Sequence, residues 1–301
     1  MITLFALIKR NGKLFFKDKG LFFTSLVTPL ILLVLYVTFL GNVYRDSFQS
    51  SLEEGITVAD KVMNGLVGGE LFSSLLAVCC VTVAFCSNML MVQDKVSGAR
   101  SDLTIAPVRP SVLALGYYIA TFFSTMIICL TAAAAGMLYL MNVGWYLSAL
   151  DILFILADVF LLVMFGTALS SIINFFLSSQ GQISAVGTII SAGYGFICGA
   201  YMPISNFGEG LQKVLSFLPG TYGTSLIRNH AMRGVFAEMT EIGFPTEIIE
   251  EIRDGVDCNL YFNGDKVGMS AMYLILGGSV ILLLGIYIMI NRRMGNRAKR
   301  A

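Results

Sequence analysis

The sequence predicts an all-α membrane protein, with six transmembrane helices in a single domain over residues 1–301, and three observations support this. The chain is 56% hydrophobic and 13% charged, whereas a soluble domain carries about 25% charged residues. Its apolar residues are gathered into long runs, which is typical of a protein that crosses a bilayer. Its lysines and arginines lie between those runs and at the chain ends. The net charge of +1 gives no indication of a nucleic-acid partner.

The segment 1–20 predicts an interfacial helix on the inner leaflet. Its apolar residues, such as Phe5 and Phe16, and its lysines, such as Lys9 and Lys13, can occupy different faces of a helix. Helices that lie on a membrane surface have this pattern. An ordinary basic flank of the first span is the alternative. We expect the following apolar run to be retained, because it has full membrane length and no signal-peptide cleavage site ends it.

Six apolar runs are long enough to cross a bilayer, which takes about 20 residues. The third and fourth runs exceed this length, so we expect them to tilt, kink or protrude. The six predicted spans are Leu21–Gly41, Leu71–Val92, Val112–Met141, Leu150–Phe176, Ile183–Met202 and Val267–Ile290.

The distribution of basic residues predicts that both termini lie in the cytoplasm. With the N-terminus inside, the inner segments hold thirteen lysines and arginines in 56 residues, and the outer segments hold seven in 99. Cytoplasmic connections carry such an excess in membrane proteins. The last outer segment also holds nine acidic residues. The inner segments are 1–20, 93–110, 175–181 and 291–301, and the outer segments are 42–68, 142–149 and 203–266.

The outer segment 203–266 predicts more than a simple loop. Its first part, Pro203–Leu226, is apolar enough to enter the membrane but is interrupted by glycine and proline. Two short re-entrant helices fit this composition, since irregular backbone at membrane depth must be sheltered by protein or by a water-filled cavity. Thr246–Asp254 predicts a short amphipathic helix in an external cap, punctuated by Pro245 and Gly255. The role of the acidic segment 238–265 is open.

The sequence provides no basis for an enzyme. It has no G-x-x-x-x-G-K-[ST] phosphate loop, and its single histidine, His230, allows no assembled catalytic triad or metal cluster. We therefore expect no cofactor and no metal in this chain. The cysteines form no CxxC pair, and Cys258, in a polar loop, is expected to be a free thiol.

The inner loop Gln93–Pro110 is a candidate docking element for a cytoplasmic partner. A short helix here would place Leu103 and Ile105 beside charged residues, a mixed face that suits helix-in-groove docking. The residues that we assign to this contact are Asp94, Lys95, Gly98, Arg100, Leu103 and Pro107.

Two loose motifs together resemble the ATP-binding-cassette type-2 permeases, the membrane subunits of certain ABC exporters. Family members show a charged pair, Gly-Thr, a Leu and a Pro-Val in the inner loop, and a P…LQ…P-x-T-Y…L-x-x-R pattern between their last two spans. Here Asp94 stands where the family often has Glu, and Ala99 where it has Thr. The matching residues are Asp94-Lys95, Gly98-Ala99, Leu103 and Pro107-Val108, then Pro203, Leu211-Gln212, Leu218-Pro219, Thr221-Tyr222, Leu226 and Arg228.

The resemblance implies a separate role for each part of this chain and for its partner proteins. The inner loop would be a coupling helix that sits in a groove of a separate ATP-binding subunit, which would bind ATP and Mg. A second permease, either another copy or a sister chain, would complete the transporter in the plasma membrane of a bacterium, where both would contact lipids. The re-entrant segment would form an outer gate, to which we assign Pro203, Leu218, Pro219, Tyr222 and Arg228.

The fourth and fifth predicted spans hold the candidate substrate path. Gly187, Ser191, Gly195 and Gly199 recur every four residues, and such a stripe allows close helix approach, either within the chain or along a dimer or substrate face. Asp158 lies near the middle of its span, where a charge is costly. It could bind a cationic part of the substrate, or it could have a structural partner or a solvated position. Glu70, at an outer span end, is expected to be interfacial.

The predicted function is that of the permease subunit of an ATP-driven exporter, whose cargo is amphipathic or hydrophobic, such as a drug, an antibiotic or a lipid-like compound. Abundant Met and aromatic residues suit adaptable binding of bulky apolar molecules. A polysaccharide or teichoic-acid exporter is the alternative within the family. An ion-driven secondary transporter that uses Asp158, or a structural or sensory membrane protein, are alternatives from other classes.

Overall fold

The computed structural model describes residues 2–50, 59–105 and 108–298 and is almost entirely helical. The elements in chain order are α1 (Ile2–Lys17), α2 (Lys19–Leu35), the π-helical turn η1 (Tyr36–Leu40), α3 (Gly41–Ser50), α4 (Asp60–Asn88), α5 (Leu90–Val96), α6 (Ala99–Ile105), α7 (Pro110–Val143), α8 (Ala149–Phe176), α9 (Gln180–Ile197), the 3-10 turn η2 (Ile204–Asn206), α10 (Glu209–Leu215), α11 (Pro219–Glu241), α12 (Thr246–Gly255), β1 (Tyr261–Phe262), β2 (Asp265–Lys266) and α13 (Met269–Ala298).

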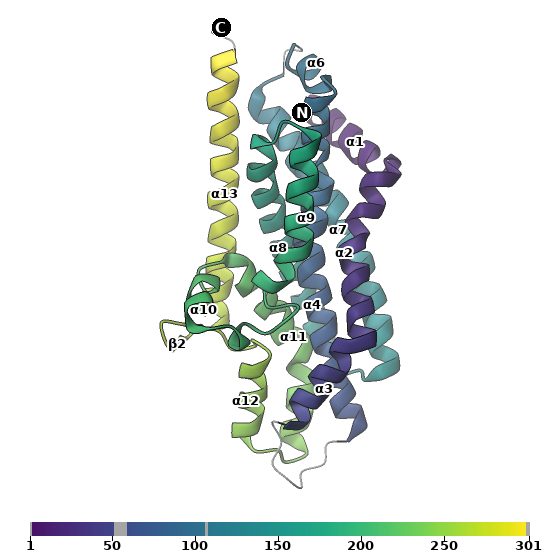
Figure 1. The fold of residues 1–301 in the computed structure, drawn as a ribbon, viewed down its shortest axis with the longest axis vertical. Coiled ribbons are helices and arrows are strands. Elements are labelled where there is room, and N and C mark those ends of the chain that lie inside the picture. Colours follow the sequence, from purple (N-terminus) through teal and green to yellow (C-terminus); the bar gives the residue numbers. More distant parts are fainter. Residues whose placement is uncertain (1, 51–58, 106–107, 299–301) are drawn as a thin grey trace.

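The long helices run side by side along the long axis of the molecule (Figure 1). Both termini and α6 lie at one end, and α12 and the end of α3 lie at the other. The central element is α4, which contacts α2, α7, α8 and α11 and is buried almost throughout. In contrast, only a minor part of the apolar window of α7 and of α13 is buried inside the bundle. An apolar surface on the rim of a bundle is what lipid contact requires, so the long helices define a membrane protein with α4 as its core.

Five helices in the described part of the chain have the length and apolar composition of a membrane span. They coincide with five of the six predicted spans, and each is longer than predicted because the helices continue past the apolar run. Their bounds are Lys19–Asp46, Asp60–Val96, Pro110–Val143, Ala149–Phe176 and Met269–Arg293.

The fifth predicted span, Ile183–Met202, is not among these five. It corresponds to α9, which ends at Ile197 because the chain turns at Gly199, whose φ of 74° lies in the left-handed region that favours glycine. Small and polar residues also lower the apolar content of α9. Its 18 residues extend about 27 Å, close to the thickness of a hydrocarbon core of about 30 Å. A membrane span at Ile183–Met202, and with it the total of six spans, therefore remains a prediction.

The predicted N-terminal helix is present as α1, and it packs against α7 and α2. Asp18 separates it from α2, and its carboxylate accepts a hydrogen bond from the Leu21 amide at 3.1 Å, which caps the start of α2. The face turned to the bundle is formed by Leu7, Asn11 and Phe15. Phe5 is exposed, so part of the predicted apolar face is left for lipid or another surface.

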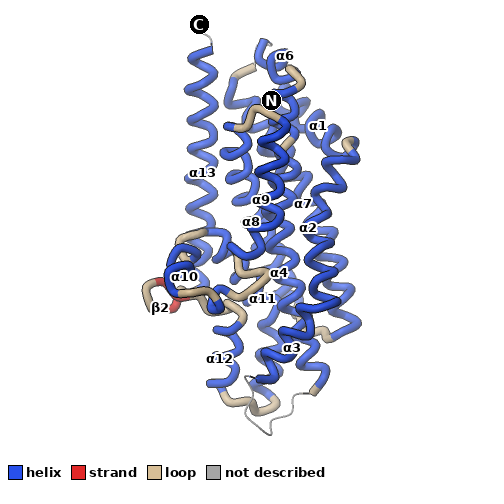
Figure 2. Tube along the Cα trace, in the orientation of Figure 1, coloured by secondary structure: helices blue, strands red, loops and turns tan. Residues whose placement is uncertain are grey.

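The chain after α9 does not cross the bundle again until α13. A short stretch with η2 and α10 leads into α11, which begins near the middle of the molecule and runs toward the end that carries α12 (Figure 1). Where the sequence predicts two short re-entrant helices over Pro203–Leu226, the structure has η2, α10 and the start of α11, and α11 continues to Glu241, well beyond the predicted limit. The re-entrant arrangement itself remains a prediction. The predicted amphipathic helix is confirmed as α12, whose isoleucines are buried. A two-stranded hairpin completes the cap before α13 (Figure 2).

Gly234 permits the closest approach between α11 and the connection from α7 to α8. A Cβ atom at this position would overlap the backbone carbonyl oxygen of Tyr146. We expect Gly234→Ala to lower the midpoint of thermal unfolding in detergent by several degrees, because backbone on both sides must move apart. Gly277→Ala, in α13, is the matched control, since nothing lies within 4 Å of its Cβ. An unchanged midpoint for Gly234→Ala would contradict this packing.

Candidate functional site

The predicted coupling residue Asp94 faces the interior of the protein. Its carboxylate accepts hydrogen bonds from Arg10 of α1 at 2.7 and 3.0 Å and from the Tyr117 hydroxyl of α7 at 2.6 Å. The side chain is 7% exposed. Asp94 therefore ties α1 and α7 to α5 instead of offering its charge to a partner protein.

Lys95, its neighbour, closes the inner end of α8. Its ammonium group donates hydrogen bonds to the backbone carbonyls of Asn174 at 3.2 Å, Leu177 at 2.9 Å and Phe175. These are among the last carbonyls of α8, which have no partner within the helix, and a cation at a helix C-terminus is favourable. Lys95 thus positions α8 relative to α5.

The exposed part of the inner loop is α6. It follows Gly98, whose φ of 83° allows the sharp turn out of α5. Leu103 is half-buried against a cluster of apolar side chains, which we call the inner apolar cluster, whereas Ile105 is 83% exposed. The buried members of this cluster are Leu7, Met91, Leu113, Ala114, Tyr117, Tyr118, Ala168, Phe175 and Tyr287. Arg100 lies over the Phe175 ring at 5.5 Å. The face available to a partner is therefore centred on Ile105, and the predicted contact residue Pro107 lies outside the described residues.

Beyond the middle of the bundle, in the half that carries α12, Arg228 of α11 is fully buried. Its guanidinium donates hydrogen bonds to Glu70 at 2.6 Å, to the Ser74 hydroxyl at 3.0 Å and to the Gly199 carbonyl at 2.9 Å. Asp257 lies 3.7 Å away. We call these five residues the Arg228 cluster. It joins α4, α11, the turn after α9 and the external cap in one buried charged network.

The expectation that Glu70 is interfacial is wrong. Its side chain is completely buried, because Arg228 comes to it from a segment 158 positions away. A carboxylate paired in this way avoids the large cost of a lone buried charge. Only the polarity of Glu70 next to an apolar run signalled its importance in the sequence.

Asp257 joins the cap to the turn after α9. Its carboxylate accepts a hydrogen bond from the Ile204 amide at 2.7 Å. Burial raises the pKa of Asp257 to about 6, although the nearby Arg228 acts in the opposite direction. Asp257 also has a φ of 55°, which few residues other than glycine, asparagine and aspartate adopt. The acidic segment 238–265 thus contributes a structural contact to the segment that was predicted to form the outer gate.

The remaining predicted gate residues shape the turn into α11. Pro203 precedes η2, and Leu218 and Pro219 form the N-cap and first residue of α11, a position that proline favours. The Tyr222 hydroxyl donates a hydrogen bond to the Ser216 carbonyl at 2.5 Å. These residues position α10 and the start of α11 around the Arg228 cluster.

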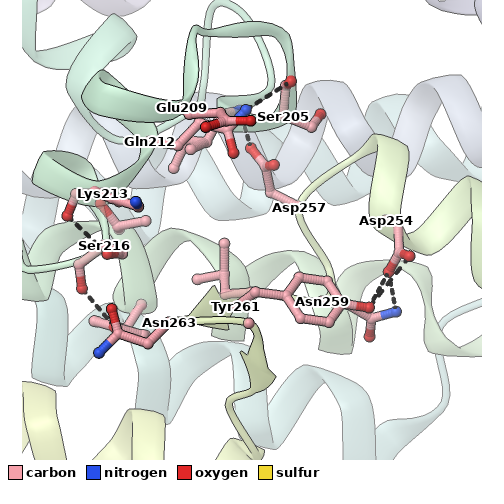
Figure 3. A pocket seen from close by; sticks show the side chains of 15 residues that line it. Ser205, Glu209, Gln212, Lys213, Ser216, Asp254, Asp257, Asn259, Tyr261 and Asn263 are labelled. Carbon is pink, nitrogen blue, oxygen red and sulfur yellow. Dashed lines mark hydrogen bonds between the residues drawn. The ribbon is translucent and has the colours of Figure 1, made fainter.

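A cavity of about 590 Å³ lies between α10 and the cap. Figure 3 shows Gln212 and Lys213 of α10 on one side and Asp254, Asn259 and Tyr261 of the cap on the other. Asn259 donates a hydrogen bond to Asp254 at 2.7 Å, which braces the cap wall. The cavity separates α10 from the cap beside Asp257 and borders residues of the predicted outer gate, such as Tyr222.

Asp158 is fully buried and has two direct partners. Its carboxylate lies 2.7 Å from Nδ1 of His230 in α11 and accepts a hydrogen bond from the Tyr273 hydroxyl of α13 at 2.5 Å. The His230 ring stacks on Phe154, with the ring centroids 4.9 Å apart. We call Asp158, His230 and Tyr273 the His230 cluster. No local pattern in the sequence connected these three residues.

The stripe of small residues on α9 divides between two environments. Gly187 and Ser191 line a groove of about 740 Å³ between α2 and α9, which we call the α2–α9 groove. Gly195 instead packs against the Tyr201 ring, and Gly199 packs against Asp257. Asp158 is not among the residues that line the groove. The candidate path residues are therefore not brought together in one site.

Residues 47–287 match the family model described as "ABC-2 family transporter protein". The match spans α4 to most of α13 and includes both the inner loop and the outer gate. The comparison with curated proteins gives no match.

Proposed function

The chain belongs to the ABC-2 transporter family, and on that premise we propose that this permease subunit is part of an ATP-driven exporter. In this proposal the end with both termini and α6 faces the cytoplasm, in agreement with the excess of basic residues there. A separate ATP-binding subunit docks on α6 and supplies the energy. A second permease completes the transporter.

One observation carries the proposal. The helices α4 and α5 form a single buried span that holds Asp94 at its inner end and Glu70 toward its outer end. Asp94 follows Glu70 by 24 positions, which corresponds to about 36 Å of helix. Because Asp94 binds Arg10 and Tyr117 while Glu70 binds Arg228, this span connects the docking end to the outer gate. A displacement of α6 can reach the gate through it.

The α2–α9 groove is the proposed cargo path. Apolar residues such as Val27 and Ile31 line it together with the hydroxyls of Thr28, Ser184 and Thr188. Its described lining includes one carboxylate, from Asp18, and no lysine or arginine. Such a surface accepts neutral or cationic amphipathic molecules and disfavours anionic ones.

The lining also favours an amphipathic cargo over a polysaccharide. Sugar paths present aromatic rings on which pyranose faces can stack, whereas Tyr201 is the one aromatic side chain among the described lining residues. The groove instead combines aliphatic walls with dispersed hydroxyls, which suits a drug, an antibiotic or a lipid-like compound.

The direct test is substrate-stimulated ATP hydrolysis. The permease should be co-purified with its ATP-binding subunit, reconstituted into liposomes, and assayed with panels of cationic, neutral and anionic amphipaths and of glycans. We expect stimulation by the first two classes and ATP-dependent efflux of the same compounds. Stimulation by glycans alone would favour the polysaccharide alternative. Transport that continues without ATP and stops when an ion gradient is dissipated would contradict the proposal.

Narrowing the groove should reduce transport without unfolding the protein. Ser184 lines the groove, and its neighbour Ala185 is exposed but does not. We expect Ser184→Phe to reduce efflux at least tenfold, because the ring would occupy part of the path, and we expect Ala185→Phe to leave efflux within twofold of the wild type. Thermal unfolding of both variants serves as the folding control. Equal efflux by the two variants would place the path elsewhere.

A further inference from the structure

We propose that His230 is a proton-binding site whose charge sets how firmly the gate helix α11 is held to the spans α8 and α13. The basis is the His230 cluster, in which one carboxylate of α8 is shared between a histidine of α11 and a tyrosine of α13. The proposal rests on the proposed function only in treating α11 as part of the gate.

Asp158 differs from the other buried carboxylates in its partner. Glu70 faces Arg228, Asp94 faces Arg10 and Asp151 faces Arg233, and each of these arginines carries a permanent charge. Within the described chain, Asp158 has an ion-pair partner only in His230. Its countercharge therefore exists only while the imidazole is protonated.

The His230 cluster is reachable from outside the bundle. His230 and Arg233 line a cavity of about 370 Å³ between α11 and α12, which also includes Glu250 and Arg253 of the cap. The side chain of His230 is 5% exposed and that of Asp158 is completely buried. Protons thus have a polar entry to the imidazole, while the carboxylate behind it is sheltered.

The arginines near His230 are already paired and keep their charge, so His230 is the group whose charge can change. Arg233 is engaged by Asp151 at 2.6 Å. Arg253 lies 3.4 Å from Glu250 and donates a hydrogen bond to Asn229. In the described chain, the titratable and charged groups that contact His230 or line its cavity are Asp158 of α8, Arg233 of α11, and Glu250 and Arg253 of α12. On the other elements packed against α11, Tyr273 of α13 binds Asp158, Asp151 of α8 binds Arg233, and Glu70 of α4 binds Arg228.

The sign of the effect follows from the cost of a buried charge. When His230 is protonated, the imidazolium and the Asp158 carboxylate form an ion pair that holds α11 against α8. When His230 is neutral, the carboxylate keeps only neutral hydrogen-bond donors, and a buried charge without a countercharge is unfavourable. The ion pair exists at a pH acidic enough to keep the imidazole protonated, and it is lost once the imidazole releases its proton at higher pH. Acid outside the cell should therefore hold the gate closed.

The first experiment measures thermal unfolding of the full-length chain in detergent between pH 5.5 and 8.0. We expect the unfolding midpoint of the wild type to fall by about 2–4 °C more over this range than that of His230→Gln or Asp158→Asn. Asp151→Asn is the matched control on the same helix. Because it disrupts a pair with a permanently charged arginine, it should lower the midpoint while keeping the wild-type pH slope.

Tyr273→Phe provides a test that does not remove either charged group. Without the tyrosine hydroxyl, Asp158 depends more strongly on His230, so we expect a steeper pH slope than in the wild type. A wild-type slope in His230→Gln, or a slope in Tyr273→Phe no steeper than that of the wild type, would overturn the proposal. Because these measurements need neither cargo nor ATP, their failure is distinct from a failure of the proposed exporter function.

The second experiment reports on the gate itself. Cys258 is buried, and its backbone carbonyl accepts hydrogen bonds from Ser225 and Asn229 of α11. Its labelling by a membrane-impermeant maleimide therefore depends on movement of α11 or of the cap. We expect His230→Gln to label several-fold faster than the wild type at pH 6 and at the same rate at pH 8. Because the two proteins are compared at the same pH, the intrinsic reactivity of the Cys258 thiol cancels in the ratio of their labelling rates. An equal ratio at pH 6 and at pH 8 would overturn the proposal.

Discussion

Ile105→Arg is expected to abolish ATP-driven transport while leaving the fold intact. Ile105 is the most exposed large apolar side chain of α6, and burial of an isoleucine in a partner groove contributes about 1.5–3 kcal/mol. Its loss would weaken docking by roughly 10- to 150-fold, and the arginine would add the cost of a buried charge without a partner. Co-purification of the ATP-binding subunit and ATP-dependent efflux are the two measurements.

Two further variants separate docking from folding. Ile2→Arg changes an equally exposed isoleucine of α1 at the same end of the molecule, and we expect the ATP-binding subunit to remain bound. Leu103→Arg should instead lower the thermal stability, because Leu103 packs against the inner apolar cluster. Full retention of the ATP-binding subunit by Ile105→Arg would show that α6 does not dock through this face.

Arg228→Ala is expected to destabilise the protein by about 3–5 kcal/mol, since it leaves Glu70 buried without its cation. A loss of this size is a large part of the stability of a typical domain, about 5–15 kcal/mol. We expect a lower yield of monodisperse protein in detergent and a strongly reduced unfolding midpoint. The outer gate should also lose its connection to the Gly199 turn, so any folded fraction should leak cargo.

The pair can be tested as a unit. Combining Glu70→Gln with Arg228→Met removes both charges, and we expect this double variant to regain much of the stability that Arg228→Ala loses. Arg45→Ala is the control, because Arg45 pairs with an exposed carboxylate, Asp60, at 3.4 Å, and such surface pairs contribute less than about 1 kcal/mol. A loss for Arg228→Ala no larger than that for Arg45→Ala would contradict the role of the Arg228 cluster.

These predictions depend on contacts that the sequence could not supply. The long apolar runs located five spans, and the proline and glycine around Thr246–Asp254 located the amphipathic helix of the cap, because helix length and punctuation are local properties. The bounds of α9 were less well predicted. Its limit depends on Gly199, where the turn is stabilised by Asp257 and Arg228 from distant parts of the chain.

The inner loop also separates what the sequence could predict from what depends on tertiary contacts. The sequence predicted a docking segment between the second and third spans, and α6 lies there with an exposed apolar residue. Within this segment, the sequence did not distinguish Asp94 and Lys95, which bind α1, α7 and α8, from Ile105, which faces outward. A short charged loop has no strong periodicity, so its inward and outward faces depend on the helices around it.

By itself, the sequence determined that this chain is a helical membrane protein, the positions of five of its long helices, and its resemblance to a transporter family. The tertiary structure decided which polar residues meet: Arg228 with Glu70 across 158 positions and Asp158 with His230 across 72. Apolar length is a property of one segment and can be read along the chain. The partner of a buried charge depends on which helix faces pack together, and this is fixed only when the whole bundle forms.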